Sequence, residues 1–271
     1  MRIDGLSINL ATVQAQWSLR EAVAACVRHG VGGIGPWRDQ LAATGLDEAR
    51  RIIADSGLRV TGLCRGGLFP AADPAGRAAA IDENRRAIDE AAAIAADCLI
   101  LVAGGLPAGS RDIAGARLMV EEGIAAILPQ ARATGVKLAI EPLHPMYAAD
   151  RCCVNTLAHA LDICDRLRGD LGVVVDVYHV WWDPDLARQI ARAGRRILAH
   201  HVNDWLRPTT DLLFDRGMMG DGVIPLRQIR TLVEAAGFSG PQEVEIFSHA
   251  WSKRPGDEVL ATCIERFSTV C

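Results

Sequence analysis

Short apolar runs and longer helix-like segments alternate along the whole chain. The apolar runs are rich in Val, Ile and Leu and are bounded by turn residues, which is typical of buried strands. We predict eight strands, over residues 3–10, 31–37, 58–64, 98–103, 136–142, 171–178, 197–203 and 244–247.

Segments with helix start and stop signals fill the gaps between these runs. Ser18 and Glu21 form a capping-box pattern, and Gly57 and Gly135 follow helical segments in the position where glycine commonly ends a helix. Helices are predicted over residues 18–30, 46–56, 74–96, 111–134, 156–167, 184–194, 225–236 and 257–267.

Eight successive strand–helix units indicate a closed parallel barrel. Strict alternation implies parallel strands with right-handed crossovers, and a (β/α)8 barrel of about 250 residues is one domain. The first strand–helix turn has no G-x-G-x-x-G pattern, which counts against a dinucleotide-binding sheet. We therefore predict a single-domain (β/α)8 TIM barrel over residues 1–271. The irregular stretch 204–224 is expected to be functional, and the loop between His201 and Arg216 is expected to form a lid or an oligomer contact.

The last four predicted strands each end in a side chain that could bind a metal. These residues are Glu141, Asp176, His201 and Glu245. A charge at the tip of a buried strand is costly unless something pairs with it, and neighbouring barrel strands bring their tips to one rim. Three carboxylates and one imidazole form a mostly hard ligand set. It suits one divalent ion, with Mn²⁺ as first choice and Mg²⁺, Co²⁺ or Zn²⁺ as alternatives.

Composition narrows the partners and the location. The chain has 271 residues, half of them hydrophobic, and a formal net charge of −4, so no basic excess suggests nucleic-acid binding. No apolar run approaches the roughly 20 residues of a membrane span, and the N-terminus enters a strand-like run, unlike a signal peptide. The eight cysteines include no C-x-x-C pair. We predict buried free thiols, Cys152 and Cys153 included, and a cytoplasmic location.

Five motifs together resemble one known superfamily. They are Ile-Glu141-Pro, Val-Asp176-Val-Tyr-His179, His-His201-Val-Asn-Asp204, Arg216-Gly-Met-Met-Gly220-Asp-Gly222 and Val-Glu245-Ile. Over its whole length the chain resembles the sugar isomerase/epimerase superfamily with a xylose-isomerase-like barrel. Ketose 3-epimerases, hydroxypyruvate isomerases, and inosose isomerases and dehydratases belong to it. The motifs are specific for the superfamily and not for a substrate.

The resemblance implies a role for each motif residue. The four strand-end residues would be the metal ligands, and Glu141 and Glu245 would also be the acid/base pair that moves a proton through an enediolate. His179 would bind a substrate oxygen, and Arg216 would stabilise the developing oxyanion. The substrate would be a sugar or polyol, and the protein a homo-oligomer, either a dimer or a tetramer.

Residues near the predicted substrate end have two interpretations. His144, shortly after the fifth strand, either contacts substrate or is an exposed loop histidine. Arg207 follows the seventh strand and is a rival to Arg216. The second strand ends at Trp37 and Arg38, where many relatives carry a glutamate. We expect Trp37 to contact substrate, and Arg38 suggests an acidic group on the substrate.

Other side chains near the rim also leave alternatives open. Glu243 shares a face with Glu245 and could replace it as a ligand. His200 precedes His201, so we expect it on the opposite face, packed against the outer helices. His249 follows the eighth strand and could reach the site. Four tryptophans also follow strand ends and could wall a sugar pocket or contact a partner subunit: Trp181, Trp182, Trp205 and Trp251.

Three other functions share parts of this pattern. An inosose-type dehydratase would use the same enediolate and then expel a β-hydroxyl. A nuclease for apurinic sites shares the barrel, but it needs a cluster of zinc ions and more strand-end histidines than this chain offers. A non-catalytic sugar-binding barrel would leave three buried acids without a role. The sequence therefore favours a metal-dependent sugar isomerase or epimerase.

Overall fold

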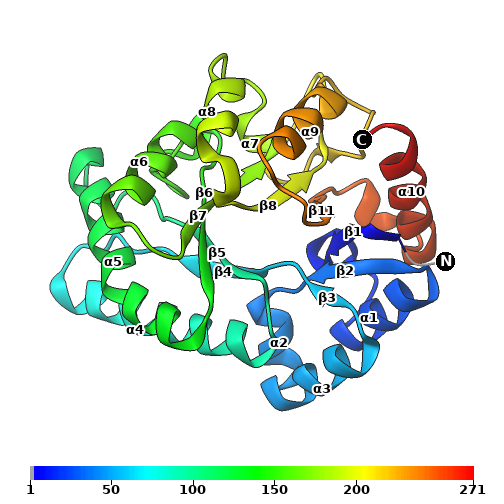
Figure 1. Ribbon diagram of the computed structural model, residues 1–271, viewed down its shortest axis with the longest axis horizontal. Helices are drawn as coiled ribbons and strands as arrows, with labels where there is room; N and C mark the ends of the chain where they lie inside the picture. Colours follow the sequence, from blue (N-terminus) through cyan, green and yellow to red (C-terminus); the bar gives the residue numbers. More distant parts are fainter. Residues whose placement is uncertain (1–2) are drawn as a thin grey trace.

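The computed structural model describes residues 3–271 of the chain. Its main sheet has nine parallel strands in the order β3-β2-β1-β11-β8-β7-β6-β5-β4, and Figure 1 shows them at the centre of a ring of helices. The strands are β1 (Ile3–Asn9), β2 (Val31–Gly35), β3 (Arg59–Val60), β4 (Leu63–Gly67), β5 (Cys98–Val102), β6 (Lys137–Glu141), β7 (Leu171–Asp176), β8 (Ile197–Val202) and β11 (Gln242–Val244). Two short strands, β9 (Asp204–Trp205) and β10 (Arg216–Gly217), pair antiparallel beside it.

The sheet closes into a barrel with eight strand positions. Only Thr61 and Gly62 separate β3 from β4, so these two strands together form the third barrel strand, and nine strands fill eight positions. Backbone hydrogen bonds join this strand to β2. The Thr61 N–H donates to Ile34 O and the Cys64 N–H to Pro36 O, both at 3.0 Å. The predicted (β/α)8 barrel is confirmed.

Helices connect successive strands and cover the outside of the barrel (Figure 1). The longer helices are α1 (Leu19–Arg28), α3 (Leu46–Ser56), α4 (Pro74–Ala93), α5 (Ile113–Thr134), α6 (Leu157–Leu167), α8 (Leu186–Ala193), α9 (Leu226–Ala235) and α10 (Gly256–Thr269). Two short helices follow strand ends, α2 (Arg38–Thr44) and α7 (Val177–Val180). Single 3-10 turns lie at Leu10–Val13, Pro145–Tyr147, Gly194–Arg196 and Trp251–Lys253.

Helix α1 illustrates how the sequence sets a boundary and a buried face. The predicted capping box is present, because the Ser18 N–H donates to Glu21 Oε2 at 2.9 Å and the Ser18 side chain accepts from the Glu21 N–H. Its buried residues recur at helical spacing and face the barrel wall: Leu19, Ala22, Val23 and Cys26.

Most strands differ from their predicted bounds by one to three residues, and two of these differences lie beside predicted ligands. The sixth strand was predicted to reach Tyr178, but β7 ends at Asp176. The Asp176 carboxylate accepts the Tyr178 N–H at 2.9 Å and so caps the short helix α7. The eighth strand begins at Gln242, two residues before its predicted start. Pairing continues to the Glu245 N–H, which donates to Val202 O at 3.1 Å. Asp176 and Glu245 therefore still lie at the carboxyl ends of their strands.

The inside of the barrel is filled by a small cluster, separate from the large core between strands and helices. It contains Cys64, Cys98, Ile100, Ala139, Val174 and Ala199. Ala139, Val174 and Ala199 lie two residues before Glu141, Asp176 and His201, the predicted ligands of the fifth, sixth and seventh barrel strands. Residues two apart share a face of a strand. The strand-end residues therefore face the barrel interior.

The cysteines are free, and seven of the eight are buried. Burial raises the pKa of the Cys153 thiol to about 11, which suits an inert core thiol better than a redox pair with Cys152. The prediction of buried free thiols is confirmed. A search of the helices within residues 3–271 found none with the length and apolar character of a membrane span.

His200 lies on the outer face of β8, as predicted. It is 1 % exposed, its ring meets Phe238 edge-on at 6.4 Å between centroids, and neither ring nitrogen has a hydrogen-bond partner. Burial lowers the pKa of His200 to about 3. The ring is therefore neutral at neutral pH.

The free energy of unfolding should fall on acidification because of His200. Its pKa in the fold lies below the unfolded value of about 6.5, so the unfolded chain binds the extra proton between these values. Each pH unit below about 6.5 then removes up to about 1.4 kcal/mol. Denaturant titrations in EDTA should show a flatter pH slope for His200→Leu. His249→Gln, which removes an exposed histidine, should keep the parent slope; equal slopes for the parent and His200→Leu would contradict the assignment.

Candidate metal centre

The four predicted ligands meet at the mouth of the barrel. Glu141 ends β6, Asp176 ends β7, His201 lies in β8 and Glu245 directly follows β11. The strand register sets Asp176 beside His201 and His201 beside Glu243. Ligand atoms of the four predicted residues all lie within 4.8 Å of one another, and none of these residues is more than 6 % exposed.

The donor atoms of this cluster fit one divalent cation. Glu141 Oε1 and His201 Nδ1 are buried without a hydrogen-bond partner, although they lie 3.2 Å apart. Buried polar atoms are nearly always paired, so this arrangement indicates atoms adapted to a ligand. Two ligands at about 2.2 Å from one ion lie at most about 4.4 Å apart, close to the spacing of this cluster. The cluster could therefore hold one metal ion.

Burial and neighbouring charges shift the pKa values of the residues in this cluster. Burial alone would lower the pKa of His201, but the neighbouring carboxylates, led by Glu243, raise it to about 10. Burial raises the pKa of Glu245, against the opposing effect of Arg216. Burial also disfavours the charged form of Asp176, yet Arg216 and two histidines hold its pKa below the ordinary value. The excess of carboxylates attracts positive charge, which a proton on His201 or a metal ion can supply.

Arg216 reaches into the cluster from β10. Its Nη1 donates to Asp176 Oδ2 at 3.1 Å and to Glu245 Oε2 at 2.8 Å, and its Nη2 lies 3.2 Å from His179 Nε2. His179 Nδ1 accepts the backbone N–H of His144 at 3.2 Å, which leaves the proton of the neutral ring on Nε2. Burial lowers the pKa of His179 to about 3. Arg216 and His179 therefore present N–H groups to the same space.

Hydrogen bonds fix the stretch 204–224 at two places beside the site. The Asp204 carboxylate accepts three backbone N–H groups at 2.9 to 3.0 Å, from Gly220, Gly222 and Ile224. These bonds close the segment that carries Arg216. A second anchor is Leu212 O, which accepts the Tyr178 hydroxyl at 2.8 Å and also the Tyr147 hydroxyl. Leu213 and Arg216 of this segment line the pocket, and its role as a lid or an oligomer contact stays a prediction.

Glu243 supports the cluster from one pleat below. Its Oε1 accepts from Asn9 Nδ2 at 2.7 Å and lies 3.6 Å from His201 Nε2, while the Thr61 hydroxyl donates to its other oxygen. A Cβ atom at Gly35 would lie 2.2 Å from this carboxylate, so glycine in β2 makes room for it. The group of four close ligand atoms includes Glu245 and not Glu243.

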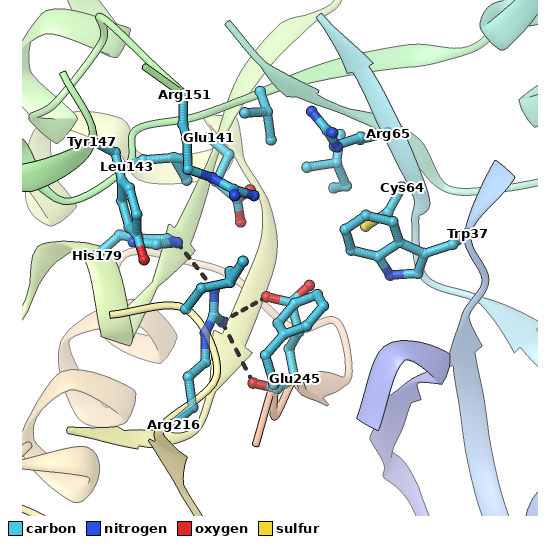
Figure 2. Close-up of a pocket in the computed structure, with 14 residues that line it drawn as sticks. Trp37, Cys64, Arg65, Glu141, Leu143, Tyr147, Arg151, His179, Arg216 and Glu245 are labelled. Carbon is cyan, nitrogen blue, oxygen red and sulfur yellow. Dashed lines mark hydrogen bonds and ion pairs between the residues drawn. The ribbon is translucent and has the colours of Figure 1, made fainter. Parts of the chain in front are cut away.

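A pocket opens above the cluster, and Figure 2 shows the side chains around it. Its empty volume, including the open mouth, is about 470 Å³. Five predicted site residues line it: Trp37, Glu141, His179, Arg216 and Glu245. Trp37 is held in place because its Nε1 donates to Asn9 Oδ1 at 2.7 Å.

Two predicted substrate-binding residues lie outside the pocket lining. The His144 ring stacks on Trp205 at 5.0 Å between centroids, and its backbone N–H supports His179. Arg207 is exposed in the loop after β9. The four tryptophans that follow later strand ends are also outside the lining, as is His249, which stacks on Phe214 at 4.8 Å.

Arg38 also lies outside the pocket lining, so the suggested contact with an acidic substrate group is corrected. Its Nη2 donates to Glu90 Oε1 at 2.9 Å and lies 2.8 Å from Glu83 Oε1, both on α4. The Arg38 guanidinium therefore forms its ion pairs with the outer helix α4 and not with a ligand in the pocket.

Sequence analysis missed three polar residues of the pocket, namely Arg65, Tyr147 and Arg151. Arg65 comes directly after the predicted third strand, and Tyr147 and Arg151 lie in the loop after the fifth. Loops at the carboxyl ends of barrel strands build the active sites of this fold. The rule that found the metal ligands therefore also covers these three residues.

Comparison with protein families agrees with the barrel and its site. A family model described as Xylose isomerase-like TIM barrel matches residues 23–267. This match covers most of the chain, and the protein belongs to the xylose isomerase-like TIM barrel family. The resemblance found in the sequence motifs is confirmed.

Individual relatives differ in how much of the chain they match. The solved structure of protein SMc04130 from Sinorhizobium meliloti 1021 is 67 % identical, with a TM-score of 0.98 over 99 % of this chain and 98 % of that one. An inosose isomerase from Halalkalibacterium halodurans is 28 % identical over 137 residues, which are 49 % of this chain and 47 % of the relative. The chain thus spans about half the length of this curated relative.

More distant structures share the fold. The IOLI protein, solved with a zinc atom, is 21 % identical, with a TM-score of 0.84 over 98 % of this chain and 97 % of that one. Epimerases also occur among the solved structures with this fold.

Replacing Glu243 by Gln should weaken metal binding without unfolding the chain. The variant loses the carboxylate that faces His201 Nε2, so the ring is no longer held with Nδ1 toward the other ligands. Loss of such an outer partner typically lowers metal affinity by about 10- to 100-fold. Calorimetric titration with Mn²⁺ measures the effect, and Glu122→Gln, at an exposed ion pair with Arg77, should bind as the parent does. Equal affinity in Glu243→Gln and the parent would sink the assignment.

Proposed function

We propose that this protein is a divalent-metal-dependent isomerase or epimerase that acts on a ketose or related polyol. The observation that carries the proposal is the buried group of Glu141, Asp176, His201 and Glu245 at the barrel mouth. Membership of the xylose isomerase-like family supports it, as does the likeness to an inosose isomerase over half the chain.

The resident metal in this proposal is Mn²⁺, held by the four strand-end residues. Three carboxylates suit a hard ion such as Mn²⁺ or Mg²⁺, while the imidazole also admits Co²⁺ or Zn²⁺, and the IOLI relative was solved with zinc. A bound divalent ion supplies Lewis-acid polarisation of a carbonyl and a neighbouring hydroxyl, which acidifies the C–H bond between them.

The two glutamates act as the acid/base pair. Glu141 and Glu245 approach His201 Nδ1 from separate strands, at 3.2 and 3.9 Å. One carboxylate takes the proton from the substrate carbon, and the bonding electrons form an enediolate. The other group starts as the carboxylic acid and delivers its proton, on the opposite face in an epimerisation or at the neighbouring carbon in an isomerisation, and proton exchange with solvent resets the pair. The raised pKa of Glu245, caused by burial, suits a group that must both accept and release a proton.

Arg216 and His179 hold the oxygen on which charge develops. Both direct N–H groups into one space, 3.2 Å apart at Arg216 Nη2 and His179 Nε2. Two donors that face each other are better matched to an intervening substrate oxygen than to one another. Arg216 is itself fixed by Asp176 and Glu245, so these donors need little rearrangement during the reaction.

Two further properties of the protein remain predictions. They are its assembly into a dimer or tetramer and its cytoplasmic location.

Solvent deuterium exchange tests the proton transfer directly. Ketoses, inososes and hydroxypyruvate incubated in D₂O with Mn²⁺ should gain deuterium at the carbon next to the carbonyl. EDTA should abolish this exchange and Mn²⁺ should restore it. Glu245→Gln and Glu141→Gln should each slow exchange by about 10²- to 10⁴-fold, the usual contribution of a positioned acid or base. Glu122→Gln, distant from the pocket, should exchange at the parent rate.

Three results would count against the proposal in different ways. Exchange that survives complete metal removal contradicts the metal dependence. Full activity of Glu245→Gln contradicts its role as acid/base. A product that has lost water, detected by mass spectrometry, replaces the isomerase or epimerase with a dehydratase.

A further inference from the structure

Two arginines line the pocket without a partner from the chain. Arg65 lies on β4 and Arg151 in the loop after β6, and both are partly buried. Within residues 3–271 neither guanidinium makes a hydrogen bond or an ion pair, and Arg151 only lies over the Tyr147 ring at 5.5 Å. Arg216 and Arg38, by contrast, are each paired with two carboxylates.

The two guanidinium groups face the same part of the pocket. Figure 2 shows them on the side away from Arg216 and Glu245, with the Glu141 carboxylate near Arg151. Burial lowers the pKa of Arg65, and so does the positive charge of Arg151. The Glu141 and Asp39 carboxylates attract Arg65 and oppose this effect, but neither forms an ion pair with it. Two like charges close together destabilise each other, which is a common cost of a binding site.

The metal cluster accounts for only part of the charge of these arginines. Its three carboxylates, the buried Glu243 carboxylate and Arg216 carry four negative charges and one positive charge, a net of −3 that a divalent ion reduces to −1. Arg65 and Arg151 then add two positive charges, and among the residues that the structure describes no carboxylate lies within ion-pair distance of either. A ligand group with one negative charge would restore the balance, and one with two would reverse its sign only by one.

We propose that Arg65 and Arg151 form an anion-binding subsite, and that the substrate is a ketose or polyol bearing a carboxylate or a phosphate. Planar guanidinium groups bind both oxyanions through paired N–H donors. A neutral sugar would leave both cations unpaired in a partly buried pocket, which disfavours it. The ketose or polyol part rests on the proposed function, whereas the anion subsite does not.

Three probes with the same three-carbon skeleton test the subsite and distinguish a carboxylate from a phosphate. Calorimetric titrations of the full chain with Mn²⁺ use D-glycerate, glycerol 3-phosphate and glycerol, and are repeated after EDTA to subtract binding through the metal. We expect one of the two anions to bind at least about tenfold tighter than glycerol. The preferred anion identifies the substrate group as a carboxylate or a phosphate.

Charge-removing variants assign the preference to the two arginines. Arg65→Gln and Arg151→Gln should each weaken binding of the preferred anion by about tenfold or more and leave glycerol binding unchanged. Their melting temperatures should equal or exceed that of the parent, because no hydrogen bond is lost and like-charge repulsion is relieved. Arg207→Gln, at the exposed arginine outside the pocket lining, should bind all three probes as the parent does.

The outcomes distinguish this inference from the proposed function. Absence of any anion preference, or a preference that both variants retain, overturns the subsite. Deuterium exchange on neutral ketoses that is as fast as on acidic ones, and insensitive to both variants, also overturns it while the proposed function stands. If the anions bind through Arg65 and Arg151 but no ketose or polyol exchanges, the subsite stands and the proposed function fails.

Discussion

The barrel mouth must keep three carboxylates charged in a place that water barely reaches. A buried carboxylate without a partner costs several kcal/mol, and a whole domain is stable by only about 5–15 kcal/mol. Arg216 offsets part of this cost, because it donates to both Asp176 and Glu245. Glu141 Oε1 and His201 Nδ1 remain without a hydrogen-bond partner. A divalent cation is the counter-charge that this arrangement fits, which links the stability of the mouth to its chemistry.

Several distant features of the fold serve the same constraint. The Asp204 carboxylate closes the loop that brings Arg216 to the cluster, by accepting three backbone N–H groups. Glycine at position 35 leaves room for the Glu243 carboxylate, which faces His201 on the side away from the other ligands. These contacts come from strands and loops far apart in the sequence, and together they fix the positions of the ligands. Such preorganisation is what a Lewis-acid site requires.

The barrel and the ligand residues could be predicted because each depends on a local pattern. Strand and helix periodicity gave the eight units, and the strand-end rule singled out the side chains that the fold brings together. The residues that line the rest of the pocket were predicted less accurately. Whether an arginine faces the pocket depends on partners elsewhere, and Arg38 is taken up by two glutamates of α4 whereas Arg65 is not. His144 likewise follows a barrel strand, but its ring stacks on Trp205, which is distant in sequence.

The central claim is that one divalent ion binds the four strand-end residues. Anomalous X-ray diffraction from crystals of the full chain grown with Mn²⁺ tests it most directly, because the manganese signal locates the ion without assumptions about the reaction. The account predicts a single strong peak within coordination distance of Glu141, Asp176, His201 and Glu245. A peak elsewhere, or none at saturating Mn²⁺, would contradict it.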